Sequence, residues 1–411
     1  MHIIVLPLLL LCHGVANIHC SAVHESRPQD LRSLLDFKRG ITSDPHRALS
    51  NWTTRSHFCY WECTLEQPRR VWGLQLSRQC LSGQISSSLG NLTFLYELDL
   101  SYNNFVDISS NSLVGSIPPK LGLLSNLGYL NLRSNQLNGS IPGELGQLKL
   151  KYLILGDNKL SGEIPQAFFR LSSLQYLSLE LNMLGKALPP NIGELLPNLI
   201  EVTLENNNFE GPIPDCLGNN ALGLKMIDLS YNNFTGRIPT SLGKLSNLTF
   251  LNLQDNQLVA RKNQDWEFLN ALRNCRFLEG SLPQSIGDLS TSLQVLLLGG
   301  NSLSSQVPQS IGKLSALTWL GLGENNFSGT IEGWIENLKR IRRLCLQSNN
   351  FTGPILSSIS NLTQFYNNLL GPISQNFGNL QQLALVDLRD NNLATWWHNS
   401  GDITQVSTKL K

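Results

Sequence analysis

The sequence has few of the residues on which catalysis and metal binding depend. Its seven histidines lie at or before position 57 or at position 398, so residues 71–393 contain none. That absence removes most Ser/His/Asp and Cys/His arrangements from this region. No GxxxxGK[ST] loop is present, and the Asp and Glu residues show no repeated pairing. We therefore expect a protein that is not an enzyme, without catalytic residues, metal or cofactor.

Charge and long apolar runs are also scarce. Charged residues make up 15% of the chain and the net charge is +1, which gives no electrostatic reason to expect a nucleic-acid partner. The apolar run Ile3–Cys12 is too short to span a membrane and is typical of a signal peptide. Small-residue cleavage sites follow at Gly14–Ala16 and Cys20–Ala22. We assign 1–22 to the signal and expect no membrane insertion after its removal.

One pattern dominates the remaining sequence. Leu127–Leu148 reads LGYLNLRSNQLNGSIPGELGQL and fits LxxLxLxxNxLxGxIPxxLGxL, which returns about every 24 residues between 71 and 393. A fixed period of this size predicts a solenoid of stacked coils. We expect about 14 repeats, three of them incomplete, after an N-terminal cap at 23–70 and before a non-repeat tail at 394–411.

The repeat positions predict where each side chain lies. Leu130 and Leu132 alternate along a short strand and should face the interior, which leaves Tyr129 and the other intervening residues on a concave sheet. The amide of Asn135 is suited to bond backbone groups at the end of the strand. Together these positions predict a leucine-rich repeat solenoid: a right-handed superhelix with a parallel concave sheet and an irregular or 3-10 convex side.

Three stretches depart from the regular period. Asn103 and Asn111 are only 8 residues apart, which we interpret as the loss of 16 residues from one repeat. After Cys275 the motif LEGSLP appears without a preceding strand motif, and Asn349 and Asn367 are 18 residues apart. Because each coil contacts only its neighbours, such losses should weaken the solenoid locally. We expect early proteolysis near residues 101–110.

The cap has a helix and a pair of cysteines. Asp30–Ile41 has helical apolar spacing, and Asp44-Pro45 should end that helix. Cys59 and Cys63 follow, and in a secreted chain we expect a disulfide between them, with two free thiols as the alternative. A zinc site would need further ligands, and the nearby sequence supplies none.

Aromatic residues on the concave positions are the candidate binding residues. Tyr129, Tyr152 and Tyr176 take the same strand position in three consecutive coils, and Phe250 and Trp319 take it further along. Rigid aromatics are typical interface anchors, although rings at this spacing could simply stack on each other. Acidic and basic residues further along favour an extended peptide or protein ligand; these are Glu180, Glu205, Asp228, Arg342, Arg343 and Arg389.

The sequence also has eight N-x-[ST] sequons, which are glycan acceptors in a secreted protein. They are Asn51, Asn91, Asn138, Asn233, Asn247, Asn326, Asn350 and Asn361.

Several motifs together resemble the extracellular domain of plant leucine-rich-repeat receptor kinases. They are the cap run DLRSLLDFK…DP…LSNW…FCYWEC…RVWGLQL, the GxIP repeats and the insertion ARKNQDWEFLNALRNC at Ala260–Cys275. The insertion is similar to that of the branch containing immune receptors for bacterial patterns. The resemblance implies a peptide or protein ligand, a co-receptor, a disulfide in the cap, and a location outside the cell or on the outer face of the plasma membrane. It also implies truncation before the membrane helix and the kinase.

Two points qualify what the resemblance implies. The family's cap motif is CxWxGVxC, whereas Cys59 and Cys63 lie three residues closer together, so Cys80 is another candidate partner. Two other functions also fit the sequence: a secreted inhibitor of microbial cell-wall hydrolases and a truncated gene product without function.

Overall fold

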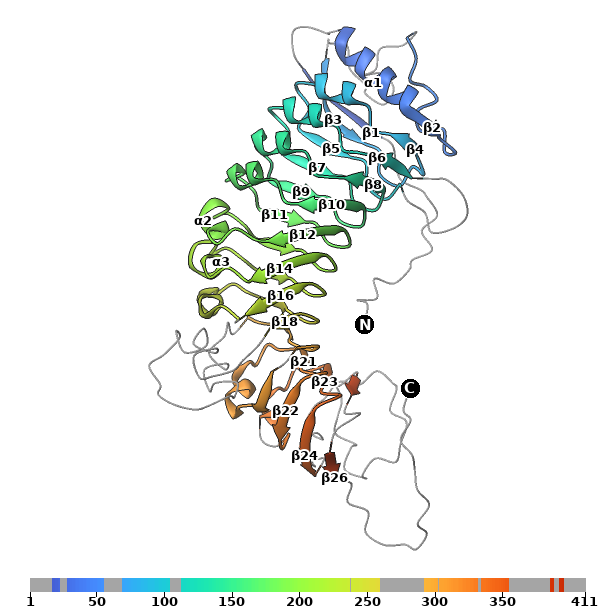
Figure 1. The fold of residues 1–411 in the computed structure, drawn as a ribbon. Helices are drawn as coiled ribbons and strands as arrows, with labels where there is room; N and C mark the ends of the chain where they lie inside the picture. Colours follow the sequence, from blue (N-terminus) through green and yellow to red (C-terminus); the bar gives the residue numbers. More distant parts are fainter. Residues whose placement is uncertain are drawn as a thin grey trace, which may run out of the picture. The chain divides into compact units, whose positions relative to one another are not determined.

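The computed structural model describes residues 17–22, 28–54, 69–103, 112–236, 238–258, 292–301, 303–331, 334–354, 385–387 and 392–394. The chain divides into two compact units. Unit 1 is Met1–Lys186 with Glu201–Asn208, and unit 2 is Ala187–Ile200 with Phe209–Lys411. Each unit is a stack of coils, as the repeat predicts (Figure 1).

In unit 1, one strand from each coil joins a parallel concave sheet, in sequence order. The strands are β3 (Arg69–Gln75), β5 (Glu97–Asp99), β7 (Tyr129–Asn131), β9 (Tyr152–Ile154), β11 (Tyr176–Ser178) and β13 (Glu201–Thr203). The alternating leucines face inward as predicted: Leu130 and Leu132 are completely buried. This confirms the parallel concave sheet.

A second sheet and a row of 3-10 helices complete each coil of unit 1. The second-sheet strands are β4 (Ser82–Gln84), β6 (Leu113–Gly115), β8 (Gln136–Gly139), β10 (Lys159–Glu163) and β12 (Met183–Ala187). The 3-10 helices are η2 (Ser87–Asn91), η3 (Pro119–Leu123), η4 (Gly143–Gln147) and η5 (Gln166–Arg170). In the IPxxLG motif, Pro142 caps η4 with φ −66°. Gly146 is required because a Cβ there would meet the Ala167 carbonyl oxygen of the next coil at 2.3 Å.

The repeat asparagines link each coil to the previous one. The Nδ2 group of Asn182 donates to the carbonyls of Leu155, Leu179 and Glu180, each at 3.1 Å. Its Oδ1 accepts the N–H of Leu160 at 2.9 Å. One amide therefore satisfies backbone groups of two coils that would otherwise be buried without partners.

The N-terminal cap covers the first coil with a helix, as predicted. Helix α1 (Pro28–Gly40) buries Leu34 and Phe37 completely, and β2 (Ile41–Ser43) pairs with β4. Asp30 accepts two hydrogen bonds from the guanidinium of Arg70, at 2.8 and 3.0 Å, and both side chains are almost completely buried. This ion pair joins α1 to the first strand of the solenoid.

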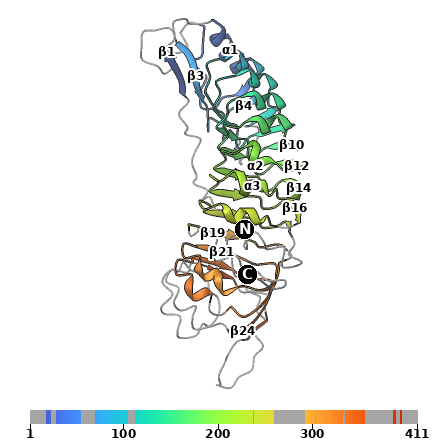
Figure 2. The same ribbon diagram turned by 90° about the vertical axis from the view of Figure 1, so that its left-hand side faces the viewer.

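An additional strand covers the outer edge of the concave sheet of unit 1. Strand β1 (Asn17–Ala22) pairs antiparallel with β3, from Asn17 opposite Gln75 to Ala22 opposite Arg69 (Figure 2). The sequence analysis placed these six residues inside the signal peptide and did not predict a strand there.

Unit 2 repeats the same plan, with one parallel concave strand from each coil. Its concave strands are β15 (Met226–Asp228), β17 (Phe250–Asn252), β19 (Val295–Leu297), β21 (Trp319–Gly321), β23 (Arg343–Cys345) and β25 (Leu385–Asp387). Its other strands are β14 (Asn208–Pro212, whose first residue belongs to unit 1), β16 (Asn233–Gly236), β18 (Gln257–Leu258), β20 (Ser304–Gln306), β22 (Asn326–Gly329), β24 (Asn350–Pro354) and β26 (Asn392–Ala394). Its helices are α2 (Ile192–Leu195), α3 (Cys216–Asn220), η6 (Thr240–Lys244), η9 (Gln309–Lys313) and η10 (Ile335–Asn337).

The strand register corrects the predicted loss at Asn103–Asn111. Leu98 pairs directly with Leu130, 32 residues later, whereas Leu74 pairs with Leu98 after 24. The Nδ2 groups of Asn103 and Asn135 both donate to the Leu100 carbonyl, so these two are the repeat asparagines of successive coils. This coil is therefore eight residues longer than its neighbour, not sixteen residues short. We expected early proteolysis near residues 101–110; positions 104–111 lie outside the described residues, and this expectation stays a prediction.

Each of the other two irregular stretches lies between two strands that pair directly with each other. Leu251 pairs with Leu296 after 45 residues, and Leu344 pairs with Val386 after 42. The insertion Ala260–Cys275 and the asparagine at 367 lie outside the described residues. The tail at 395–411 does so as well.

Candidate functional site

The three tyrosines predicted to form a column do so on the concave face of unit 1. Tyr129 pairs with Tyr152 and Tyr152 with Tyr176 in the strand register, and all three side chains are partly exposed. The rings of Tyr152 and Tyr176 stack, with centroids 4.6 Å apart, whereas those of Tyr129 and Tyr152 are tilted and 5.5 Å apart. The stacking that we weighed against binding is therefore present for one pair. This stacking covers one face of each of the two rings.

An ion pair runs along one side of the tyrosine column. Arg133 contacts Glu180, although a whole coil separates them in the stack. Gly156 occupies the coil between them, and a Cβ at that position would meet the Glu180 Oε1 atom at 2.3 Å. Ser178 and Thr203 also donate to Glu180 Oε2, at 2.7 and 2.8 Å. Glu180 is therefore a fixed part of the face and is unavailable as an isolated charge.

Polar groups near Tyr129 are held by hydrogen bonds. The Asn131 amide donates to the Tyr129 hydroxyl at 3.2 Å, and the hydroxyl of Ser101 donates to Asp99. Burial raises the pKa of Asp99, and its bonds with Ser101 partly oppose that rise. Burial also raises the pKa of Tyr129, and the nearby Asp99 carboxylate adds to the increase. The pKa of Tyr176 is raised by burial and then by Glu201, so both tyrosines carry neutral hydroxyl groups at physiological pH.

Two aromatic pairs in the first two coils were missed by the sequence analysis. Trp72 stacks on Tyr96 with ring centroids 5.2 Å apart, and the Arg78 guanidinium lies 5.0 Å from the ring centroid of Tyr102. Trp72 and Tyr96 take the second position of the repeat, and Arg78 and Tyr102 take the eighth. Aromatic residues were compared above only at the third position. Aligning all concave positions would have identified both pairs.

In unit 2 the predicted aromatic residues do not form a continuous column. Phe250 and Trp319 take the same strand position, but Val295 lies between them in the register. The guanidinium of Arg343 lies 4.9 Å from the centroid of the Trp319 ring. Cys345 is a partly exposed free thiol beside them, and burial raises its pKa. The three stacked coils of unit 1 therefore give the larger continuous aromatic surface.

The cysteine predictions are partly answered by the described residues. Cys216 is free and buried on α3. Cys80 is disulfide-bonded. The cysteines at 59 and 63, for which we expected a mutual disulfide, lie outside the described residues, as does the one at 275. The pairing of Cys59 with Cys63 stays a prediction.

The sequons lie mainly on exposed parts of the coils. The asparagine is exposed in six described sequons and partly exposed at Asn91, whereas position 361 is not described. Asn233, Asn326 and Asn350 each begin a second-sheet strand, away from the concave positions. Glycans on these residues would leave the concave faces uncovered, but their modification stays a prediction.

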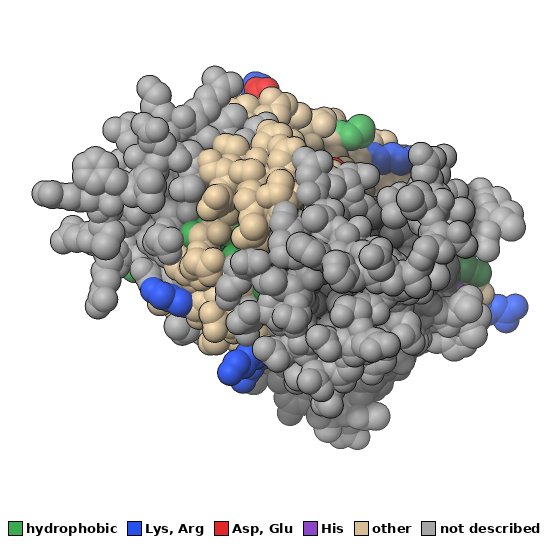
Figure 3. Space-filling view, turned by 90° about the horizontal axis from the view of Figure 1, so that it is seen from below, with side chains coloured by type: hydrophobic (Ala, Val, Ile, Leu, Met, Phe, Trp, Pro, Cys, Tyr) green, Lys and Arg blue, Asp and Glu red, His purple; other side chains and the backbone are tan. Residues whose placement is uncertain are grey.

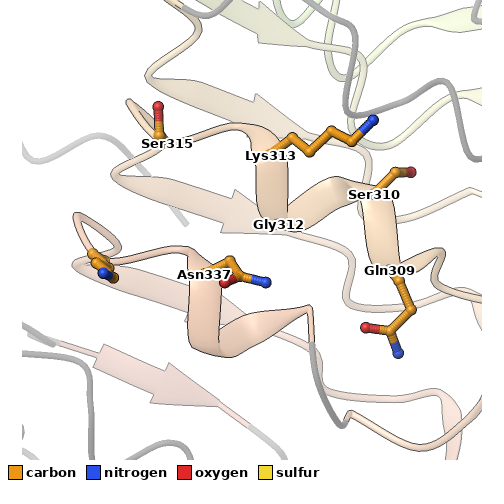
Figure 4. A pocket seen from close by; sticks show the side chains of 7 residues that line it. Gln309, Ser310, Gly312, Lys313, Ser315 and Asn337 are labelled. Atoms are coloured by element: carbon orange, nitrogen blue, oxygen red, sulfur yellow. The ribbon is translucent and has the colours of Figure 1, made fainter.

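A separate hollow lies on the convex side of unit 2. It has a volume of about 790 Å³ and lies between η9 and η10 (Figure 4). Gln309, Ser310 and Lys313 come from η9, and Asn337 comes from the next helix. The buried Ser310 hydroxyl has no hydrogen-bond partner among the described residues. The hollow is open to solvent, and none of the described residues that line it is aromatic.

The described part of the chain shows no sign of three other classes of site. There, no group of three or more His, Cys, Asp or Glu side chains is placed to hold a metal ion. No described helix combines the length and the apolar character needed to cross a bilayer. On the face shown in Figure 3, the described Lys and Arg side chains lie apart and form no continuous basic patch.

Comparison with known families and sequences gives matches along much of the chain. Residues 27–63 match the family described as leucine rich repeat N-terminal domain. Residues 126–148, 149–171, 198–220, 223–245 and 291–351 match leucine rich repeat families. The receptor kinase-like protein Xa21 of Oryza sativa subsp. japonica is 39% identical over 90 residues. That match covers 20% of this chain and 9% of Xa21, so it spans about a tenth of the relative's length.

Solved structures give broader matches. The structure of PEPR1–AtPEP1 has a TM-score of 0.62 and 30% sequence identity, covering 89% of this chain and 56% of that one. The plant peptide hormone receptor RGFR1 in complex with RGF2 has a TM-score of 0.51 and 26% identity, covering 79% of this chain and 54% of that one. Both likenesses extend over most of this chain but only about half of the other.

Proposed function

Starting from a leucine-rich-repeat protein whose relatives are plant receptor kinases, we propose that this chain binds a peptide or protein ligand. The binding surface is the concave face of unit 1, centred on Tyr129, Tyr152 and Tyr176. The observation that carries the proposal is that this column takes no part in the buried core. Rings of this kind offer a large contact area at little entropic cost. The structures of PEPR1–AtPEP1 and of RGFR1 with RGF2 support a peptide as the ligand.

The geometry favours a peptide over a flat saccharide. A sugar stacks on an open aromatic face, whereas the Tyr152–Tyr176 stack covers one face of each of these rings. Edges and hydroxyl groups suit the amide groups and side chains of an extended peptide, which hydrogen-bond in many directions. Binding without catalysis is part of the proposal; the Glu180 carboxylate beside the tyrosine column is held by Arg133 and two hydroxyl groups.

We propose the cellular location and the biological role from the sequence motifs and the relatives together. A signal peptide and exposed sequons support a secreted or cell-surface glycoprotein. The likeness to the receptor kinase-like protein Xa21 supports a role in plant signalling, with a co-receptor as a second partner. The insertion at 260–275, which resembles that of the immune-receptor branch, supports a role in defence. A longer transcript encoding a membrane helix and a kinase would support the receptor over a secreted inhibitor.

The test begins with peptides selected from a random displayed library of 12-residue sequences panned against the full chain. Changing Tyr129, Tyr152 and Tyr176 to Ala should lower the affinity of the chain for these peptides by more than about 30-fold, the equivalent of about 2 kcal/mol. The matched control is Leu123→Ala, because Leu123 is 60% exposed on η3 and lies off the concave face.

Stability must be measured alongside affinity. Losing the Tyr152–Tyr176 stack should cost about 1 kcal/mol of unfolding free energy, so the triple variant should remain folded. Tyr152→Phe and Tyr176→Phe keep the stack and remove only the hydroxyl groups. Unchanged affinity in a folded triple variant would overturn the proposal.

A further inference from the structure

Two glutamates bracket the tyrosine column at the same strand position. Glu97 pairs with Tyr129 in the register, and Tyr176 pairs with Glu201. The column therefore reads Glu97, Tyr129, Tyr152, Tyr176 and Glu201 over five consecutive coils. Both glutamate side chains are partly exposed. Glu97 accepts a hydrogen bond of 2.8 Å from the neutral amide of Gln75, so its negative charge is not neutralised by that contact.

The surrounding concave positions of unit 1 are also more acidic than basic. Counting every outward position of the six strand motifs gives six carboxylates: Glu97, Asp99, Asp157, Glu180, Glu201 and Glu205. The same positions give three cations: Arg78, Arg133 and Lys151. Arg133 is paired with Glu180, and Arg78 lies over the Tyr102 ring. Lys151 lies beside the centre of the column, so the excess of negative charge is greatest toward its two ends.

The distance between the two glutamates sets the spacing of a complementary ligand. Adjacent strands lie about 4.8 Å apart, so four steps from Glu97 to Glu201 span roughly 19 Å. An extended peptide rises about 3.3 Å per residue, so about six residues cover that distance. The tyrosines between the glutamates offer apolar ring edges and neutral hydroxyl groups to the middle of such a segment.

We infer that the ligand is an extended peptide with two basic side chains about six residues apart. One basic side chain lies at Glu97 and the other at Glu201, and the residues between them contact the tyrosine column. This inference rests on the proposed function and adds the chemical class of the peptide. An ion pair at each end would also fix the ligand's position along the stack, because a shifted ligand would leave one glutamate without a partner.

The experiment uses the peptides selected by panning against the full chain. The selected sequences should carry Lys or Arg at two positions five to seven residues apart. The double variant Glu97→Gln and Glu201→Gln should bind such peptides with about 4- to 20-fold lower affinity, as expected for the loss of two partly exposed ion pairs. Raising the salt concentration from 50 to 500 mM should weaken binding to the unmodified chain and have less effect on the double variant.

The matched control is Glu144→Gln, because Glu144 is exposed on the convex helix η4 and should leave affinity unchanged. Selected peptides that depend on the tyrosines but lack the basic pair, or bind the double variant equally well, would overturn this inference and leave the proposed function standing. Peptides that depend on neither the tyrosines nor the glutamates would overturn both.

Discussion

At the scale of single residues, buried charges decide how firmly the cap is attached. Asp30 is completely buried, and Arg70 is its bidentate partner. Arg70 also donates to the Thr93 hydroxyl at 3.0 Å and lies 4.4 Å from the centroid of the Phe94 ring. One guanidinium therefore contacts both the cap and the next coil.

We predict that Arg70→Ala lowers the unfolding free energy of the cap by about 3–5 kcal/mol, because it leaves the Asp30 charge buried and unpaired. Chemical denaturation followed by hydrogen exchange of α1 measures this loss. The control is Glu163→Gln, which breaks the exposed pair with Lys186 and should cost less than about 1 kcal/mol. Equal effects of the two variants would show that the Asp30–Arg70 pair does not hold the cap.

Asp99 gives a prediction for pH dependence. Burial raises its pKa, so between its unfolded and folded pKa values the folded chain binds more protons than the unfolded chain. The contribution of Asp99 to the unfolding free energy therefore falls as pH rises through that interval. Asp99→Asn should be more stable than the unmodified chain at pH 7 and equally stable well below pH about 3.9. Denaturation at both pH values tests this; lower stability of the variant at pH 7 would contradict it.

At the scale of elements, the repeat template predicts what is local to one coil. The spacing of Leu130, Leu132 and Asn135 fixes a strand, its buried face and its terminal amide, and the structure confirms all three. The tyrosine column follows from the same spacing because successive coils stack in register. These features depend on residues within one period, so one sequence is enough to predict them.

Contacts that skip a coil could not be predicted in this way. Arg133 reaches Glu180, 47 residues away, only because Gly156 lacks a side chain in the coil between them. The spacing of asparagines also gave a wrong prediction at Asn103, because spacing alone does not show which asparagine bonds to the previous coil. The bonds made by Asn135 show that its predecessor is Asn103.

Strand β1 leads to a prediction about processing. Cleavage after Ala16 would keep all of β1, whereas cleavage after Ala22 would remove it and leave the outer edge of β3 unpaired. Unpaired sheet edges are prone to aggregation. We predict that the secreted protein begins at Asn17. N-terminal sequencing of protein secreted from a eukaryotic host checks this, and a chain beginning at Val23 would contradict it.

At the scale of the whole molecule, the coils of each unit supply a frame of buried leucines and asparagine hydrogen bonds, and the concave positions supply the chemistry. Hydrophobic core, asparagine ladder and helical turns recur with the same roles in both units. The outward residues of the strands are free to vary because the core does not need them. Function in this account therefore belongs to a few outward residues in unit 1, and the frame only sets their spacing.

The tyrosine column is the proposed recognition surface. Hydroxyl-radical footprinting with mass spectrometry tests it most directly, because it measures the solvent accessibility of side chains with and without a saturating selected peptide. Met183, which is 50% exposed on the second-sheet strand β12, is the internal control. Bound peptide should lower the labelling of Tyr129, Tyr152 and Tyr176 and leave that of Met183 unchanged. Unchanged labelling of the three tyrosines at saturation would contradict it.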